Sequence, residues 1–268
     1  MELKILSPKA EEKGKKSLPA QFKEKVRPDL IARAVLTLQS NKRQKYGASK
    51  EAGIRASANL SKRRRKYRGT YGIGQSRTPR KVMSRRGTRL NYVGAFAPQT
   101  VGGRRAHPPK ADKNWDKKIN KKENRKAIRS ALAATTDKKI VKEHGHILPE
   151  AYPFIIDNSF ESLSKTKEIK TALVALGLKD ELTRSSKKII RAGKGKGRGR
   201  KYRKKKGILI VVEKDCNLNK AARNIPGLDI TMISSINAEL LAPGTVPGRL
   251  TLFTEAAIEK LEKDKLFM

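Results

Sequence analysis

The chain has few of the residues from which chemical sites are usually made. Its 268 residues include one cysteine, Cys216, and three histidines. A single cysteine excludes an intramolecular disulfide and any cysteine-based zinc cluster. His144 and His146 lie close together, but no further ligand set surrounds them in the sequence. We therefore expect neither a bound metal nor a cofactor.

Acidic residues are also scarce, and their placement argues against an enzyme. The 25 Asp and Glu residues are spread among lysines and show no paired arrangement for acid–base chemistry. No serine lies in a Gly-x-Ser-x-Gly nucleophile elbow. The run Gly72-x-Gly74-x-x-Arg77 lacks the third glycine of a dinucleotide fingerprint, and 191–206 contains no Walker loop. A nucleotide-dependent enzyme is therefore disfavoured, and we expect no catalytic activity.

Long hydrophobic runs are absent as well. The longest aliphatic run, 208–212, is far shorter than the roughly 20 residues that a membrane-spanning helix needs. The chain opens with Met-Glu-Leu-Lys, which does not begin a signal peptide. We expect a soluble, intracellular protein without membrane contact.

Positive charge is abundant and unevenly placed. The formal net charge is +39, from 64 Lys and Arg residues against 25 Asp and Glu residues. Residues 42–110 hold 20 basic residues, nine glycines and one acid, Glu51, and residues 187–206 hold 12 basic residues and no acid. Cations at this density repel one another unless a polyanion binds them. The distribution therefore favours a nucleic-acid-binding protein.

The two basic segments have no pattern typical of a packed fold. Residues 42–110 show no sustained helical or strand period, and such a stretch cannot bury enough apolar surface to offset its ordering entropy. We predict a long loop that is disordered alone and becomes ordered on a polyanion. Between 191 and 201 glycine alternates with cations. The segment 187–206 is therefore predicted to be a flexible RNA-binding strand, which follows a phosphate backbone and leads into the strand at 208.

The rest of the chain, 1–41 and 111–268, has the pattern of a globular domain. Aliphatic runs predict strands, and apolar residues at helical spacing predict helices. The strands are expected at 153–157, 208–212, 229–233 and 250–253, and the helices at 28–40, 120–135, 164–176, 218–224 and after Thr254. Leu3, Ile5 and Leu6 predict a further short strand, followed by a loop up to Pro19.

This alternation predicts an α/β fold: a mainly parallel sheet with helices on both faces. The stretch 42–110 is then an extended basic loop inserted near the N-terminus of that domain.

The candidate nucleic-acid contacts are the cations of the two basic segments. Arginine presents a planar fork that matches a phosphate group, and glycine allows the backbone to approach one closely. The predicted RNA-binding residues are Lys62, Arg63, Arg64, Arg65, Lys66, Arg68, Arg77, Arg80, Lys81, Arg85, Arg86, Arg104, Arg105, His107, Lys110, Arg191, Lys194, Lys196, Arg198, Arg200, Lys201 and Arg203.

Several short motifs together resemble one known family. They are Arg27-Pro28-Asp29-Leu30-Ile31, Gly69-Thr70-Tyr71-Gly72-Ile73-Gly74, Arg77-Thr78-Pro79-Arg80, Ala106-His107-Pro108-Pro109-Lys110, Ile128-Arg129-Ser130-Ala131-Leu132, Arg191-Ala192-Gly193-Lys194-Gly195-Lys196, Arg223-Asn224-Ile225-Pro226-Gly227 and Leu241-Ala242-Pro243-Gly244. With them the chain resembles, nearly end to end, the L-four family of large-subunit ribosomal proteins. The lack of a long basic tail after the last helix places the resemblance in the archaeal branch.

The resemblance implies a structural protein of the large ribosomal subunit, in the cytoplasm, that binds large-subunit ribosomal RNA and supports assembly. It implies that the globular domain docks on RNA while the loop reaches the nascent-peptide exit tunnel, beside the L-twenty-two protein. The residues that match the loop tip, next to the nascent peptide, are Tyr71, Gly72, Ile73, Gly74, Gln75 and Ser76. The alternative from charge alone is a non-ribosomal protein that compacts RNA or DNA.

Overall fold

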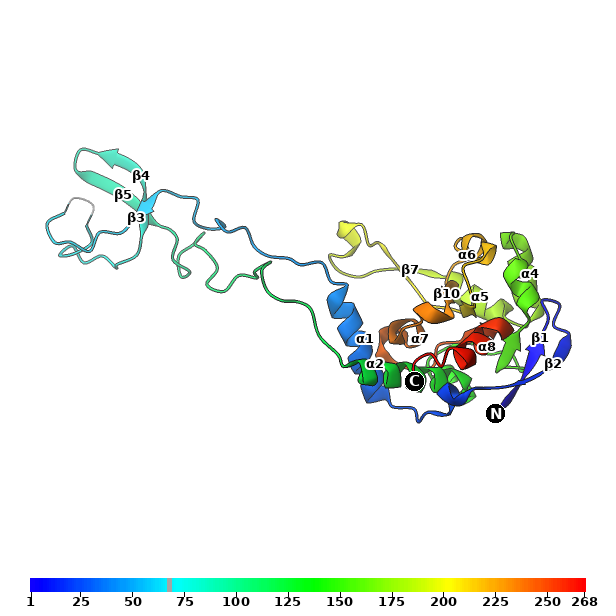
Figure 1. Cartoon of the computed structure of the whole chain (residues 1–268). Coiled ribbons are helices and arrows are strands. Elements are labelled where there is room, and N and C mark those ends of the chain that lie inside the picture. Colours follow the sequence, from blue (N-terminus) through cyan, green and yellow to red (C-terminus); the bar gives the residue numbers. More distant parts are fainter. Residues whose placement is uncertain (67–68) are drawn as a thin grey trace. The chain divides into compact units, whose positions relative to one another are not determined.

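The computed structural model describes residues 1–66 and 69–268, which form two units. Met1–Lys42 together with Asp116–Met268 is termed the body, and Arg43–Trp115 is termed the basic unit. The body contains a six-stranded and a two-stranded sheet, and the basic unit contains a three-stranded sheet (Figure 1).

The body is built on the six-stranded sheet, whose strand order is β10-β9-β11-β6-β1-β2. Neighbouring strands are parallel except for β1 and β2, which are antiparallel. The predicted α/β fold is therefore confirmed, with a mixed sheet that is parallel apart from one edge. The strands are β1 (Glu2–Leu6), β2 (Glu12–Ser17), β6 (Phe154–Ile156), β9 (Leu209–Val212), β10 (Asp229–Met232) and β11 (Thr251–Thr254).

Strand β2 shows that the loop predicted up to Pro19 was wrong. Its sequence, Glu-Lys-Gly-Lys-Lys-Ser, contains no apolar side chain and so gives no strand pattern. It forms because its main chain pairs with β1, from Glu2 opposite Ser17 to Leu6 opposite Glu12. The lysines on this exposed edge also discourage pairing with another chain.

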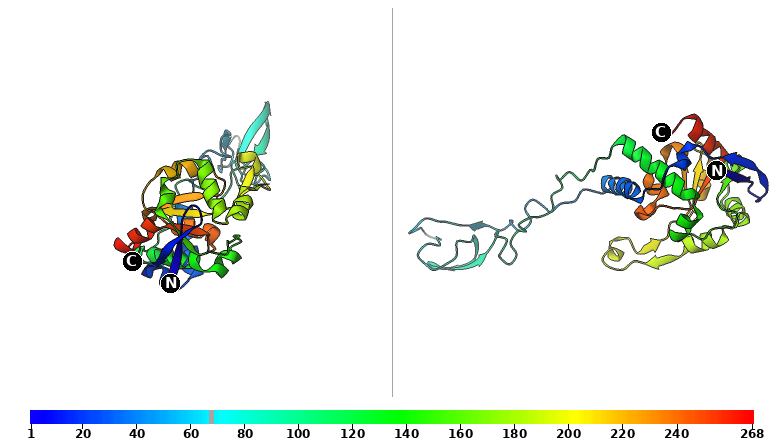
Figure 2. Two further views of the ribbon diagram at one scale, coloured as in Figure 1. Left: turned by 90° about the vertical axis from the view of Figure 1, so that its right-hand side faces the viewer. Right: turned by 90° about the horizontal axis from the view of Figure 1, so that it is seen from below.

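Side chains of the central strands alternate between two hydrophobic cores, one on each face of the sheet. On β9, Leu209 and Val211 belong to the first core, and Ile210 and Val212 belong to the second. The first core is covered by α1 (Pro28–Asn41), α2 (Lys121–Thr136), α7 (Ala238–Leu241) and α8 (Glu255–Lys263). The second is covered by α3 (Lys138–Glu143), α4 (Thr166–Ala175), α5 (Lys179–Ser186) and α6 (Asn217–Ala222). Figure 2 shows the sheet between these two sets of helices.

The start of each of two helices, and the buried side of one of them, follow from their sequences. Pro28 occupies the first turn of α1, where its missing N–H needs no partner, and Ile31, Ala34 and Val35 turn a buried stripe toward the first core. At α8 the Thr254 hydroxyl accepts the Ala257 N–H, which satisfies one of the unpaired amides of the first turn.

Helix α5 was not predicted, because its buried face is polar. Its fully buried side chains are Glu181 and Ser185, so no apolar period marks it in the sequence. None of the helices in the described part of the chain is long and apolar enough to cross a bilayer.

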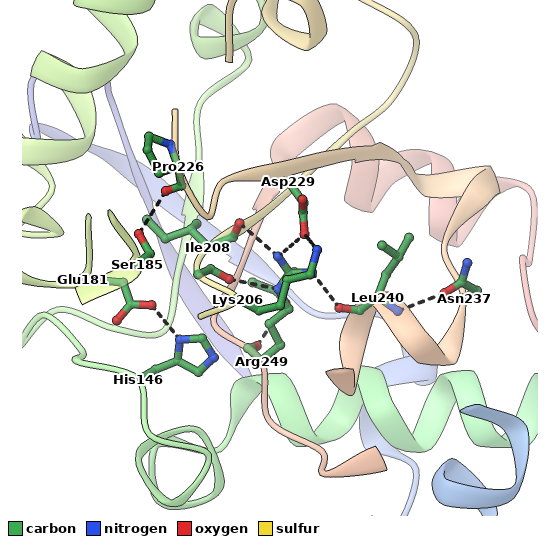
Figure 3. Close-up of polar contacts among 12 residues, drawn as sticks. His146, Glu181, Ser185, Lys206, Ile208, Pro226, Asp229, Asn237, Leu240 and Arg249 are labelled. Atoms are coloured by element: carbon green, nitrogen blue, oxygen red, sulfur yellow. Dashed lines mark hydrogen bonds and ion pairs between the residues drawn. The ribbon is translucent and has the colours of Figure 1, made fainter. Parts of the chain in front are cut away.

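A buried arginine ties together the strand ends at one end of the sheet. Arg249, only 1% exposed, precedes β11. Its Nε donates to the Gly207 carbonyl at 2.9 Å, Nη1 donates to Leu240 at 3.0 Å, and Nη2 contacts the Asp229 carboxylate at 2.5 Å (Figure 3). Burial lowers the pKa of Arg249, and the neighbouring Asp229 opposes that shift. The side chain therefore links the segment before β9, the start of β10 and helix α7.

We predict that Arg249→Met lowers the free energy of unfolding by about 3–5 kcal/mol. Loss of the guanidinium leaves the Gly207 and Leu240 carbonyls without their donor. It also removes one of the two cations that bind Asp229, the other being Lys206. Arg223→Met, at an exposed position after α6, is the matched control and should change stability by less than about 0.5 kcal/mol. Urea unfolding followed by circular dichroism measures both. A loss below about 1 kcal/mol for Arg249→Met would show that this arginine does not tie the strand ends.

Candidate nucleic-acid interface

The basic unit carries far more positive charge than it can neutralise. Arg43–Trp115 contains 20 Lys and Arg residues, and its acidic residues are Glu51 and Asp112. Most of its cations therefore have no acidic partner within the unit. Solvent and salt weaken the repulsion among them, but only a bound polyanion compensates it locally.

A three-stranded antiparallel sheet organises this unit. Its strands are β3 (Ala58–Asn59), β4 (Arg80–Arg86) and β5 (Arg89–Gly94), in that order. Strands β4 and β5 form a hairpin with a two-residue loop, Gly87-Thr88, in which Gly87 has φ +58°. A positive φ at the first central residue gives the turn the twist that a hairpin needs, and glycine adopts it without strain.

This sheet shows that the expected absence of any strand pattern in 42–110 was wrong. Along β5, Leu90 and Tyr92 are half-buried and alternate with exposed residues. The alternation was hidden by the many cations of β4. The signal that could have revealed it is a two-residue glycine turn between segments of alternating character.

The segments that lead to and from this sheet lie side by side in close backbone contact (Figure 1). The Ala48 N–H donates to the Pro109 carbonyl at 2.8 Å. A Cβ atom on Gly47 would lie 2.5 Å from the Ala111 nitrogen, and one on Gly53 would lie 2.5 Å from the Arg104 Cα. Since atoms cannot approach that closely, glycine is required at both positions.

Aromatic rings and cations pack together near the first and last residues of the basic unit. The rings of Tyr46 and Trp115 lie 4.9 Å apart. The Arg43 guanidinium lies 4.7 Å from the centre of the Trp115 ring, and the Lys113 ammonium lies 5.0 Å from it. Such cation–π contacts stabilise the pairing of the two segments without adding negative charge.

The structure places the predicted RNA-binding residues of 42–110 in three groups. Lys62, Arg63, Arg64, Arg65 and Lys66 are exposed in the connection after β3; Arg80, Lys81, Arg85 and Arg86 lie on β4, with Arg77 just before it; Arg104, Arg105, His107 and Lys110 are exposed on the returning segment. Arg68 falls outside the described residues.

Two of these arginines also brace the basic unit itself. The Arg80 guanidinium donates to the Ser76 carbonyl at 2.7 Å and to the Ser76 hydroxyl at 2.9 Å, so it holds the turn before β4. Arg85 Nε donates to the Gly87 carbonyl at 3.1 Å and closes the hairpin turn. Neither of these internal roles was predicted from the sequence.

The predicted tip residues, from Tyr71 to Ser76, form a turn with exposed side chains. Gly72 and Gly74 have φ values of +79° and +66°, and no atom would obstruct a Cβ at either position. Tyr71 is 40% exposed and Ile73 is 56% exposed. Arg77 lies 6.0 Å from the centre of the Tyr71 ring. The turn therefore presents one aromatic and one aliphatic side chain to its surroundings.

The second basic segment is a hairpin, not the flexible strand that was predicted. Strands β7 (Lys188–Ile190) and β8 (Tyr202–Lys204) pair antiparallel, and are termed the basic hairpin with the residues between them. Gly193 and Gly199, with φ +78° and +76°, shape its turn. Its predicted contact residues Arg191, Lys194, Lys196, Arg198, Arg200, Lys201 and Arg203 are all exposed.

A polar network, buried at Glu181 and His146 and exposed at Lys206, ties the segment after the basic hairpin to the body. Arg184 on α5 binds both oxygens of Glu181, at 2.5 and 2.7 Å, and also donates to the Lys206 carbonyl at 2.7 Å. His146 Nδ1 lies 2.7 Å from Glu181 Oε1 (Figure 3). The Lys206 ammonium binds Asp229 at 2.9 Å. Lys206, just after the hairpin, is therefore held both to α5, which precedes the hairpin, and to β10.

Glu181 stays ionised inside this network. Burial alone would raise its pKa, but hydrogen bonds from Arg184 and His146 and the Ile147 N–H outweigh burial and lower the pKa to about 2. His146 is thus a buried structural residue. Among the described residues, no group of three or more His, Cys, Asp or Glu side chains is placed to hold a metal ion.

Comparison with known proteins finds close similarity over nearly the whole chain. The family described as the ribosomal protein L4/L1 family matches residues 16–264. The protein named large ribosomal subunit protein uL4 from Nanoarchaeum equitans is 51% identical over 100% of both chains. Proteins of the same name from Methanococcoides burtonii and Archaeoglobus fulgidus are 45% and 43% identical, over 93% and 97% of this chain and 93% and 98% of their own.

We predict that Glu181 makes the body's stability fall in acid. Its folded pKa of about 2 lies below its ordinary value of 4.5, so the unfolded chain binds more protons between these values. Stability should be fully present above about pH 5 and should be lost progressively toward pH 2. In Glu181→Gln this part of the loss should disappear, because the side chain no longer titrates.

Urea unfolding across this pH range measures the effect, with Glu168→Gln as the control. Glu168 lies exposed on α4, so its variant should keep the pH dependence of the unchanged protein. If Glu181→Gln also keeps it, Glu181 does not carry the charge assigned to it.

Proposed function

The chain belongs to the ribosomal protein L4/L1 family, and from this premise we propose that it is a structural constituent of the large ribosomal subunit that binds ribosomal RNA. Its relatives are named as large-subunit ribosomal proteins, and the chain is not an enzyme. The observation that carries the proposal is the basic unit, where 20 cations face two acidic residues. Phosphate groups of RNA supply the missing negative charge.

In this proposal the parts of the chain bind RNA in different ways. The globular domain expected from the sequence, 1–41 and 111–268, docks on the RNA surface, and the segment 42–110 acts as an extended loop that penetrates the RNA. The basic hairpin in 187–206 provides a second phosphate-binding element. Its support is the anchor at Arg184 and Lys206, which fixes an exposed cationic element on a rigid sheet.

The turn from Tyr71 to Ser76 is proposed to reach the nascent-peptide exit tunnel. There it would contribute to the tunnel wall beside the L-twenty-two protein and contact the nascent peptide. The exposed Tyr71 and Ile73 support this role. Uncharged side chains in the tunnel wall do not form ion pairs with the charged residues of a nascent peptide, so they do not retain it. In the particle the protein works in the cytoplasm, where it supports assembly and translation.

The second candidate, a non-ribosomal protein that compacts RNA or DNA, is suggested by charge density alone. It predicts equal affinity for unrelated duplexes. The ribosomal proposal predicts preference for structured large-subunit RNA.

We predict a steep salt dependence for binding of the full-length protein to large-subunit RNA. If the basic segments contact ~10 phosphates, the logarithm of the affinity should fall with the logarithm of salt concentration at a slope of about −7 to −9. Filter binding across a salt series measures this slope. A slope near −2 would contradict binding through the basic segments.

Matched triple variants locate the contacts. Replacing Arg63, Arg64 and Arg65 with Gln should make the slope shallower by about 2 to 3. Replacing Lys165, Lys167 and Lys170, which are exposed in and just before α4, removes the same charge and should leave the slope nearly unchanged. Equal effects would favour the compacting protein, in which charge acts without regard to position.

A further inference from the structure

The sheet of the basic unit forms one wall of a pocket with a volume of about 210 Å³. The wall consists of Ala58 and Asn59 from β3, Val82 from β4 and Tyr92 from β5. Val82 and Tyr92 are direct cross-strand neighbours, and both are half-buried. The wall thus offers an aromatic ring beside an aliphatic side chain, at the part of the unit labelled β3 to β5 in Figure 1.

The rest of the pocket lining is held in place by polar contacts. Ser61 and Gly69 pair through an isolated parallel bridge, and the Gly69 N–H donates to the Lys66 carbonyl at 2.9 Å. A Cβ on Gly69 would lie 2.8 Å from that carbonyl oxygen, so glycine allows the close turn. Arg80 fixes the neighbouring turn through Ser76. The pocket is therefore a built feature of the unit.

The lining has the chemistry that a nucleobase needs. A base has a flat face that stacks on aromatic rings and an edge with donors and acceptors. Tyr92 supplies the ring, and the amides of Asn59 and Gln75 supply donors and acceptors. Both amide side chains are exposed, and within residues 1–66 and 69–268 neither hydrogen-bonds to another protein group. They are therefore available to a ligand.

The charges at the pocket favour a nucleic acid over a peptide. Lys66 and Arg80 both line it, and no acidic side chain does among the described residues. The surrounding unit has the same strong cationic excess. A nucleotide brings a phosphate with its base, so one ligand satisfies the cations and the amides together.

We propose that this pocket receives a single unpaired nucleobase of the RNA that the basic unit binds, an inference that rests on the proposed function. Tyr92 stacks on the base, Asn59 and Gln75 hydrogen-bond to its edge, and Lys66 contacts its phosphate. The base comes from a single-stranded or bulged position, because a paired base would first have to leave its helix. The pocket therefore adds recognition of one position to a surface that otherwise follows the phosphate backbone.

Chemical probing of assembled large subunits that contain the full-length chain tests this. Dimethyl sulfate and a carbodiimide report on the edges of bases, and hydroxyl radicals report on the RNA backbone. In subunits with the Asn59→Ala, Gln75→Ala double variant, one base should become at least fivefold more reactive, with unchanged backbone protection. Asn91→Ala is the control, because Asn91 precedes Tyr92 on β5 and does not line the pocket; it should expose no base.

The two probes separate this inference from the proposed function. If the backbone is protected and the double variant changes no base, the pocket holds something else, such as a side chain of a neighbouring protein, and the inference is wrong. If Asn91→Ala exposes the same base, the effect is not specific to the pocket and the inference is also wrong. If the unchanged protein protects no RNA backbone, the proposed function itself fails.

Discussion

Repulsion among the cations of the basic unit determines how this unit can be built and what it has to bind. Twenty basic residues against Glu51 and Asp112 leave the unit unable to neutralise itself. It is shaped instead by contacts that add no negative charge: the β4–β5 pairing, the close approach of Gly47 to Ala111, and the rings of Tyr46 and Trp115. Such contacts bury little apolar surface, so the missing stabilisation has to come from a polyanionic partner.

The body, in contrast, is stabilised by its own contacts. Its sheet buries apolar side chains on both faces, and its deeply buried charges are satisfied internally, as Arg249 and Glu181 show. A rigid, self-sufficient body can hold the basic hairpin at a fixed place through Arg184 and Lys206. Positioning charge on a rigid element reduces the ordering entropy lost when RNA binds.

Local sequence predicted the elements whose causes are local. Pro28 with Ile31, Ala34 and Val35 marks α1, and the aliphatic run at 208–212 marks β9, because each signal lies within the element. Strand β2 was missed because only its pairing with β1 makes it a strand. Helix α5 was missed because it buries Glu181 against Arg184 and His146, the latter 35 residues away.

The candidate site, too, was predictable from the sequence only in part. Its composition was evident from the sequence, since charge is a property of the residues alone. Its geometry was not, because the pocket joins Asn59, Gln75 and Tyr92 from separate segments. Likewise, the bracing role of Arg80 depends on where the Ser76 turn folds. A sequence read one window at a time cannot bring such residues together.

Sedimentation with ribosomal subunits shows whether this chain is a component of the large subunit that is held there by its basic segments. Large subunits, small subunits and an unrelated duplex RNA are each mixed with the full-length protein and sedimented in high salt. We expect the protein to stay with the large subunits and to be released from the other two. Equal retention on all three, or release from all three, would contradict it.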